Sequence, residues 1–166
     1  MVHTNPLIAL PPKEVPLTNA PLVRVIAQVR FPPILSIEKK DFVGSFQEAI
    51  RDTYPILQPE QTQGLILGPQ GLMQADPQMV WRFADADGNW RVSLASGSIS
   101  LETIAYSSRN NFIERLEYVL NALDVHIKPQ IVERFGLRYI DRLINQELKD
   151  IQKLVRSEIA GKLTNI

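Results

Sequence analysis

The chain of 166 residues has the length of one domain, and it carries 18 basic and 18 acidic side chains and no cysteine. The zero net charge argues against general nucleic-acid binding, whose usual footprint is a basic domain. The missing cysteines exclude disulfides, thiolate metal sites and a cysteine nucleophile, and they fit a reducing compartment. Because we find neither a basic-then-apolar leader nor an apolar run near the ~20 residues that span a bilayer, we expect a soluble, cytoplasmic protein without a membrane partner.

The first 21 residues are rich in proline. Five of the twelve prolines lie there, and proline fixes φ and lacks a backbone donor. Residues 1–21 are therefore predicted to form an extended, proline-rich N-terminal arm. An α+β domain is expected at 22–144, followed by an amphipathic helix within 145–166.

The domain is predicted to begin with a strand followed by a helix. In residues 22–31, every second side chain is apolar, and the side chains between them are arginine, isoleucine and glutamine. This alternation is typical of a strand with one buried face. Residues 37–54 repeat apolar side chains at spacings of three and four, which indicates a helix. Ser36 is the expected N-cap of this helix, and Pro55 is expected to end it.

A segment rich in proline, glycine and glutamine comes next. Residues 56–78 are predicted to form an irregular connection with one short strand at 65–67. A β-meander follows, with strands at 79–84, 90–95 and 99–106. The Asp-Gly in the turn at 85–89 is a hairpin signal, and this turn lacks the closing glutamate and the flanking helices of a calcium-binding loop.

The last third of the chain is predicted to be helix, strand and helix. Asn110 or Asn111 is the expected N-cap of the first of these helices. Its core stripe comprises Phe112, Leu116, Val119, Leu120 and Leu123. A strand at 131–141 and a helix at 146–160 complete the chain. The predicted fold class is α+β, a mostly antiparallel sheet in the order β-α-β-β-β-β-α-β-α with the helices packed on one face.

The sequence contains no recognisable catalytic constellation. His3 and His126 are the two histidines, and neither has a second histidine at ligand spacing. We therefore expect no metal site, no Ser-His-Asp triad and no cofactor. The carboxylates that remain as acid or base candidates are Asp85, Asp87, Glu102 and Glu133. Trp81, Trp90 and Tyr139 are expected in the core or at its edge.

Four arginines are expected on the face of the sheet that points away from the core. They are Arg24, Arg30, Arg134 and Arg138, provided that their two strands join one sheet. A guanidinium group presents a planar fork of donors that suits a carboxylate or a phosphate, so this face is a candidate anion or nucleic-acid surface. The alternatives are pairing with Glu102 or Glu133, simple solvation, or a protein interface.

The predicted terminal helix carries an apolar stripe that must pack against something. The stripe comprises Ile144, Leu148, Ile151 and Val155, at spacings of four, three and four. It packs either on its own domain or against another chain, and the second alternative makes these four residues an interface.

Several short segments resemble one protein family. They are residues 22–31 (LVRVIAQVRF), Tyr54-Pro55, Trp81-Arg82-Phe83, residues 99–103 (ISLET) with Tyr106, and residues 134–140 (RFGLRYI). The chain is similar in these segments, roughly from residue 20 to residue 142, to an uncharacterised, sporadically distributed prokaryotic protein family. That family has no established activity, its distribution points to accessory genes, and its members are usually longer than this chain.

Two functions follow as hypotheses. The first is a non-catalytic interaction or assembly module that binds a protein partner, most simply itself as a homodimer, without a cofactor. The second is an anion- or nucleic-acid-binding domain that uses the arginine face. The neutral charge and the absent catalytic groups favour the first.

Overall fold

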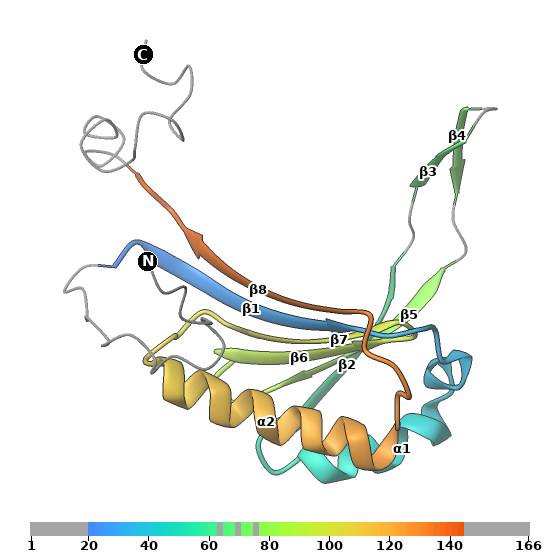
Figure 1. Cartoon of the computed structure of the whole chain (residues 1–166), viewed down its shortest axis with the longest axis horizontal. Coiled ribbons are helices and arrows are strands. Elements are labelled where there is room, and N and C mark those ends of the chain that lie inside the picture. The colour runs from blue at the N-terminus through green and yellow to red at the C-terminus, as the bar shows by residue number, and fades with distance from the viewer. Residues whose placement is uncertain (1–19, 63–64, 69–70, 75–76, 145–166) are drawn as a thin grey trace, which may run out of the picture.

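A computed structural model describes residues 20–62, 65–68, 71–74 and 77–144, and no side chain between 63 and 76. Six strands form one antiparallel sheet in the order β2-β5-β6-β7-β1-β8, and two helices lie on one of its faces (Figure 1). The elements are β1 (Leu22–Arg30), a 3-10 turn (Leu35–Glu38), α1 (Lys40–Ile50), β2 (Ile56–Thr62), β3 (Leu65–Gly68), β4 (Gly71–Gln74), β5 (Gln78–Ala84), β6 (Trp90–Ala95), β7 (Ser98–Thr103), α2 (Arg109–His126) and β8 (Arg134–Asp141). The predicted α+β class, with its antiparallel sheet, is confirmed.

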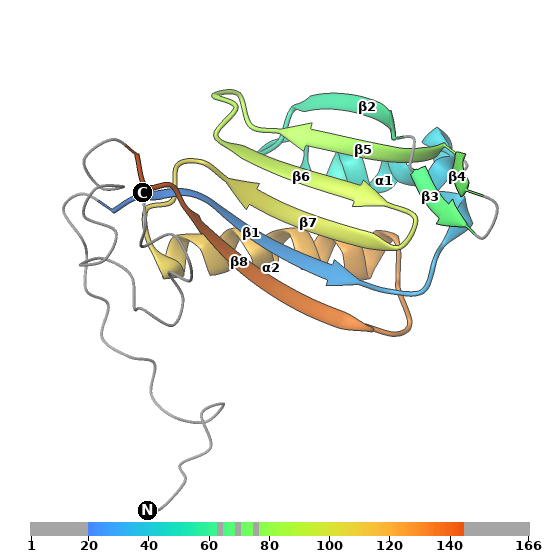
Figure 2. The ribbon, with the colours of Figure 1, turned by 90° about the horizontal axis from the view of Figure 1, so that it is seen from above.

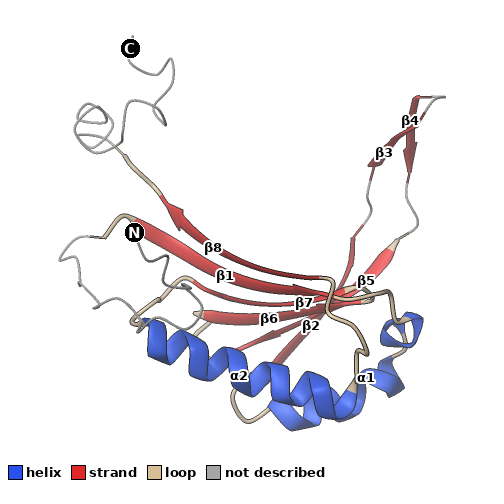
Figure 3. Cartoon of the chain, in the orientation of Figure 1, coloured by secondary structure: helices blue, strands red, loops and turns tan. Residues whose placement is uncertain are grey.

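The molecule has two layers, a curved sheet and the helices beneath it (Figure 3). In Figure 1 the sheet bends away from the helices at both ends, so its uncovered face is concave. Seen from above, α1 lies below the β5 and β6 side of the sheet and α2 runs below β1 and β7 (Figure 2). The outermost strands are β2 and β8.

The core lies between the sheet and the helices. Alternation along the strands buries Val25, Ala27 and Val29 of β1 on the helix side, as predicted. Phe46 of α1 meets Phe83 of β5 edge to face, with ring centroids 5.6 Å apart. The buried apolar residues of the helices are Val43, Phe46 and Ile50 on α1, and Phe112, Leu116, Val119, Ala122 and Leu123 on α2.

The starts of both helices differ from the prediction. Ser36 lies inside the 3-10 turn, and Lys39 is the N-cap of α1, without a side-chain hydrogen bond. The N-cap of α2 is Ser108, whose hydroxyl accepts a hydrogen bond of 3.2 Å from the backbone N–H of Asn111. Ser108 has the extended backbone that an N-cap needs, and it lies two residues before Asn110 and three before Asn111, the two expected N-caps.

The segment at 56–78 holds more strand than predicted. The short strand expected at 65–67 is present as β3, and it pairs with β4 in a separate two-stranded sheet. No strand was predicted at the position of β2, which pairs with β5. All but one of the β2 residues are exposed, so no buried face imposes an alternating pattern, and an edge strand tolerates Pro59.

Two predicted segments lie outside the described residues. They are the N-terminal arm, except for its last two residues, and the helix at 146–160. The predicted strand at 131–141 begins later, at Arg134.

Candidate functional site

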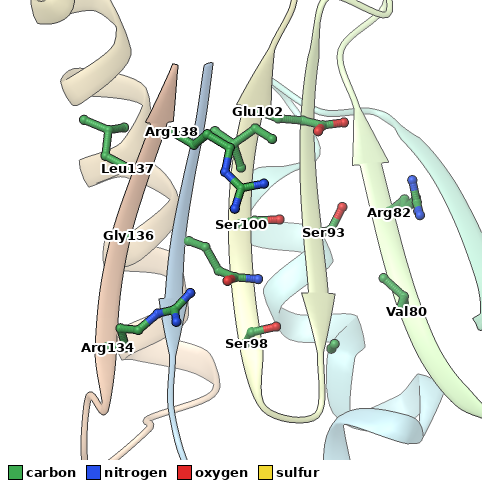
Figure 4. Close-up of a pocket in the computed structure, with 13 residues that line it drawn as sticks. Val80, Arg82, Ser93, Ser98, Ser100, Glu102, Arg134, Gly136, Leu137 and Arg138 are labelled. Carbon is green, nitrogen blue, oxygen red and sulfur yellow. The ribbon is translucent and has the colours of Figure 1, made fainter. Parts of the chain in front are cut away.

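We call the sheet surface opposite the helices the open face. Strand register places its side chains in rows that cross the sheet. The first row, from β8 to β5, is Arg134, Arg30, Ser98, Ala95 and Val80. The second row is Gly136, Gln28, Ser100, Ser93 and Arg82. The third row is Arg138, Ile26, Glu102, Arg91 and Ala84. Except for Arg30, Arg91 and Ala84, these residues border a shallow cavity of about 540 Å³, open to solvent, which is shown in Figure 4. Arg30 borders a smaller neighbouring cavity, which shares Gln28, Ala95 and Ser98 with the first.

The open face is basic although the whole chain is neutral. Its strands present six arginines, which are Arg24, Arg30, Arg82, Arg91, Arg134 and Arg138. The carboxylates on the same strand faces are Glu60 and Glu102. The formal excess is therefore four positive charges on one surface. All four arginines predicted from the sequence lie on it, and Arg82 and Arg91 were missed because the prediction considered only β1 and β8.

Three of the six arginines pair with a glutamate, so two carboxylates partly offset three guanidinium groups. Arg24 and Arg91 both pair with Glu102, at 3.7 and 3.2 Å. Arg82 pairs with Glu60 of β2 at 2.8 Å. The Nε of Arg82 is buried and has no hydrogen-bond partner among the described residues. Pairing with Glu102 was one of the alternatives predicted for the arginines, and the structure shows it for Arg24.

The other three arginines lie toward β8 and are not neutralised. Among the residues that the structure describes, Arg30, Arg134 and Arg138 have no ion pair. Arg30 and Arg134 are direct partners in the β1–β8 register, so two guanidinium side chains start from adjacent positions on the same face. Like charges directly opposite each other destabilise a sheet.

Gly136 opens a gap between the two arginines of β8. It lies between Arg134 and Arg138 on the open face, and a Cβ added to it would meet no atom within 4 Å. In Figure 4 both arginines project over the sheet on either side of this gap, with Ser100 and Ser93 beyond it. The gap therefore leads from the sheet edge to the hydroxyl groups at the centre of the cavity.

The helix side of β8 carries an exposed apolar strip. Phe135, Leu137 and Tyr139 lie on the face that the helices cover elsewhere, yet they are 55%, 44% and 48% exposed. We call these three residues the β8 strip. The ring of Tyr139 meets Tyr106 edge to face at 5.9 Å, but Tyr139 itself is exposed and is not part of the core cluster, unlike Trp81 and Trp90, which are buried as expected. Ile131 and Val132, just before β8, are also exposed.

Only one residue of the predicted terminal stripe lies in the described part of the chain. Ile144 is exposed, and the rest of the predicted interface stripe (Leu148, Ile151 and Val155) lies outside the described residues. His126 is the last residue of α2. The turn after Asp85 is confirmed as a hairpin, in which the Asp85 carboxylate accepts a hydrogen bond from the backbone N–H of Trp90. No group of three or more histidine, aspartate or glutamate side chains in the described part of the chain is placed to hold a metal ion.

Comparison with known proteins adds no family. No protein-family model matches the chain, and no curated protein matches it. The family resemblance noted in the sequence therefore stays a prediction. Within the described residues, no helix is long and apolar enough to cross a membrane.

Proposed function

We propose that this protein is a non-catalytic assembly module that forms a homodimer through β8 in the cytoplasm. The observation that carries the proposal is the β8 strip, three half-exposed apolar side chains on an edge strand. An edge strand presents unpaired backbone groups, and a contiguous apolar surface beside them is typical of a protein interface. A second copy of the same strand satisfies both features at once.

A two-fold axis perpendicular to the sheet constrains the pairing. It keeps the helix side of both copies on the same side, so the two β8 strips become continuous. Centred on Leu137, the axis sets Leu137 against the partner's Leu137 and Phe135 against the partner's Tyr139. On the open face it sets Arg138 against the partner's Gly136. The paired segment then covers nearly all of β8, Arg134–Asp141.

Neighbouring registers are less favourable. Centring the axis on Gly136 sets Arg134 against the partner's Arg138, and centring it on Arg138 sets two copies of that arginine together. Like charges directly opposite each other on a sheet are destabilising. The Leu137 register avoids both contacts and places an apolar side chain on the axis.

Cysteine cross-linking tests the register, because the chain has no cysteine of its own. Directly opposed Cβ atoms in antiparallel strands are about 4.5–5.5 Å apart, close to the range that a disulfide spans. Leu137→Cys should therefore form a covalent dimer under mild oxidation. Ile104→Cys is the matched control, since Ile104 is similarly exposed but lies away from β8. Equal cross-linking of the two variants would refute the proposed register.

Light scattering after size exclusion tests the assembly itself. The unmodified chain should have the mass of a dimer, and Leu137→Arg should be a folded monomer, because the substitution puts a charge into the centre of the interface. Ile104→Arg should remain a dimer. Ile151→Arg tests the predicted terminal stripe, and a monomer from that variant alone would move the interface from β8 to the C-terminal segment. A monomeric unmodified chain would overturn the proposal.

A further inference from the structure

The facing arginines Arg30 and Arg134 lack the compensation that the rest of the open face has. Arg24, Arg82 and Arg91 each lie against a glutamate, whereas no described carboxylate lies within ion-pair distance of Arg30 or Arg134. Two guanidinium groups that start from opposed positions repel each other unless an anion lies between them. This corner of the sheet is therefore arranged to receive negative charge from outside the described chain.

The charge of the pair favours phosphate over carboxylate. A phosphate monoester carries about −1.5 to −2 charges near neutral pH and presents three acceptor oxygens. It neutralises both guanidinium groups and accepts hydrogen bonds from both. A carboxylate carries only one negative charge and neutralises only one of them. Ser98 lies beside Arg30 in the same row and offers a hydroxyl donor to the same group.

The second row of the open face suits a polar group attached to that phosphate. Next to the phosphate position, Gly136 leaves the cavity open, and Gln28, Ser100 and Ser93 follow across the sheet. These side chains make no hydrogen bond among the described residues that would occupy them in the free protein. An amide and two hydroxyls, free to donate and accept, match a hydroxyl-rich ligand.

The described part of the open face has no aromatic side chain on which a nucleobase could stack. Trp81, Phe83 and Trp90 all point into the core. Proteins that bind single-stranded nucleic acid use aromatic rings as stacking platforms. The cavity of about 540 Å³ is also within the range of small-molecule sites.

We infer that the open face binds a small phosphorylated, hydroxyl-rich molecule of the sugar phosphate class. The phosphate lies between Arg30 and Arg134, and the sugar hydroxyls lie over Gly136 and reach Gln28 and Ser100. Arg138 borders the other side of the gap. The arginines and polar side chains of the site all belong to one copy of the chain, so the inference does not require the dimer, although the proposed dimer would bring the partner's Arg138 beside Gly136.

Calorimetric titration of the full chain at low salt tests the ligand class with three probes. Glucose 6-phosphate should bind roughly tenfold more tightly than inorganic phosphate, because the sugar adds one or two hydrogen bonds. Glucose without phosphate should not bind measurably. A twelve-nucleotide single strand that binds more tightly than glucose 6-phosphate, and loses affinity in the same variants, would overturn the small-ligand assignment in favour of nucleic acid.

Substitutions locate the site. Arg134→Gln should weaken glucose 6-phosphate binding by roughly ten- to a hundredfold, the loss of a charge-assisted contact. Arg24→Gln is the matched control on the same face, and it should leave the affinity nearly unchanged because Arg24 pairs with Glu102 and lies near the other end of β1 from Arg30. Equal losses in the two variants would show only a diffuse charge effect and would overturn the site.

Gly136→Leu distinguishes binding of the sugar from binding of the phosphate. The position has no positive φ and no close neighbour, so the variant should fold. The leucine fills the gap between Arg134 and Arg138, and glucose 6-phosphate affinity should fall at least tenfold while inorganic phosphate affinity stays the same. Unchanged sugar phosphate binding would place the ligand elsewhere. Light scattering on each variant keeps a loss of ligand distinct from a change of assembly.

Discussion

The hydroxyl of Tyr118 on α2 donates a hydrogen bond of 2.7 Å to the backbone carbonyl oxygen of Ala49 on α1. The two residues are 69 positions apart in the chain, and the bond joins two helices that pack side by side beneath the sheet. Ala49 lies one residue before the end of α1, where carbonyl groups lack a partner within the helix. Tyr118 therefore caps one helix while belonging to the other.

Tyr118→Phe removes this bond and leaves the ring in place. We expect the free energy of unfolding to fall by about 0.5–1 kcal/mol, at the low end for a neutral hydrogen bond because water reaches the carbonyl. Urea denaturation measures the difference. Glu117→Gln, at the exposed neighbouring position, serves as the control and should change stability by less than about 0.5 kcal/mol.

Trp81→Phe should cost considerably more. The indole Nε1–H of Trp81 donates a buried hydrogen bond of 2.7 Å to the carbonyl oxygen of Ile37, which fixes the 3-10 turn against β5. The substitution leaves that carbonyl unsatisfied and opens a void beside it. We expect a loss of about 2–4 kcal/mol in the same denaturation experiment. A loss below about 1 kcal/mol would mean that the turn moves to close the void or that water reaches the carbonyl.

Burial decides which elements could be predicted from the sequence. β1 is buried on one face, so its alternation was visible and placed Arg24 and Arg30 on the open face correctly. β2 is exposed along nearly its whole length, so no pattern identified it. The facing of Arg30 and Arg134 could not be predicted either, because it depends on the register between strands that are about a hundred residues apart in the chain.

Tyr54 makes stability depend on alkaline pH. Burial raises the pKa of its hydroxyl above the ordinary value of 10.0, and the nearby Arg115 guanidinium offsets part of that rise. The folded protein therefore holds this proton more tightly than the unfolded chain does. Its contribution to stability is complete below about pH 10 and is lost as the pH rises through the folded pKa.

Tyr54→Phe tests this dependence, because phenylalanine does not titrate. The free energy of unfolding of the unmodified chain should fall more steeply above about pH 10 than that of the variant. Tyr118→Phe is the control tyrosine, being partly exposed, and should keep the steep decline. Identical pH profiles for the unmodified chain and Tyr54→Phe would show that other groups dominate the alkaline transition.

Glu102 sets how much positive charge the open face presents to a ligand. Its carboxylate is shared between Arg24 and Arg91 and offsets one of their two positive charges, and its side chain is only 20% exposed. Glu102→Gln removes that charge while keeping a similar shape, so phosphate should bind more tightly at the uncompensated arginines. We expect roughly a twofold gain in glucose 6-phosphate affinity at low salt, the size of one unit charge acting through water over about 10 Å.

Salt dependence distinguishes this long-range effect from a new direct contact. The gain in Glu102→Gln should disappear near 0.5 M salt, where the screening length falls to about 4–5 Å. Glu117→Gln carries the same change of net charge on α2, on the other side of the sheet, and should give no gain. A gain that persists at high salt would mean that Arg24 or Arg91, once released from Glu102, binds the phosphate directly. The site would then extend across the whole open face instead of lying at its β8 side.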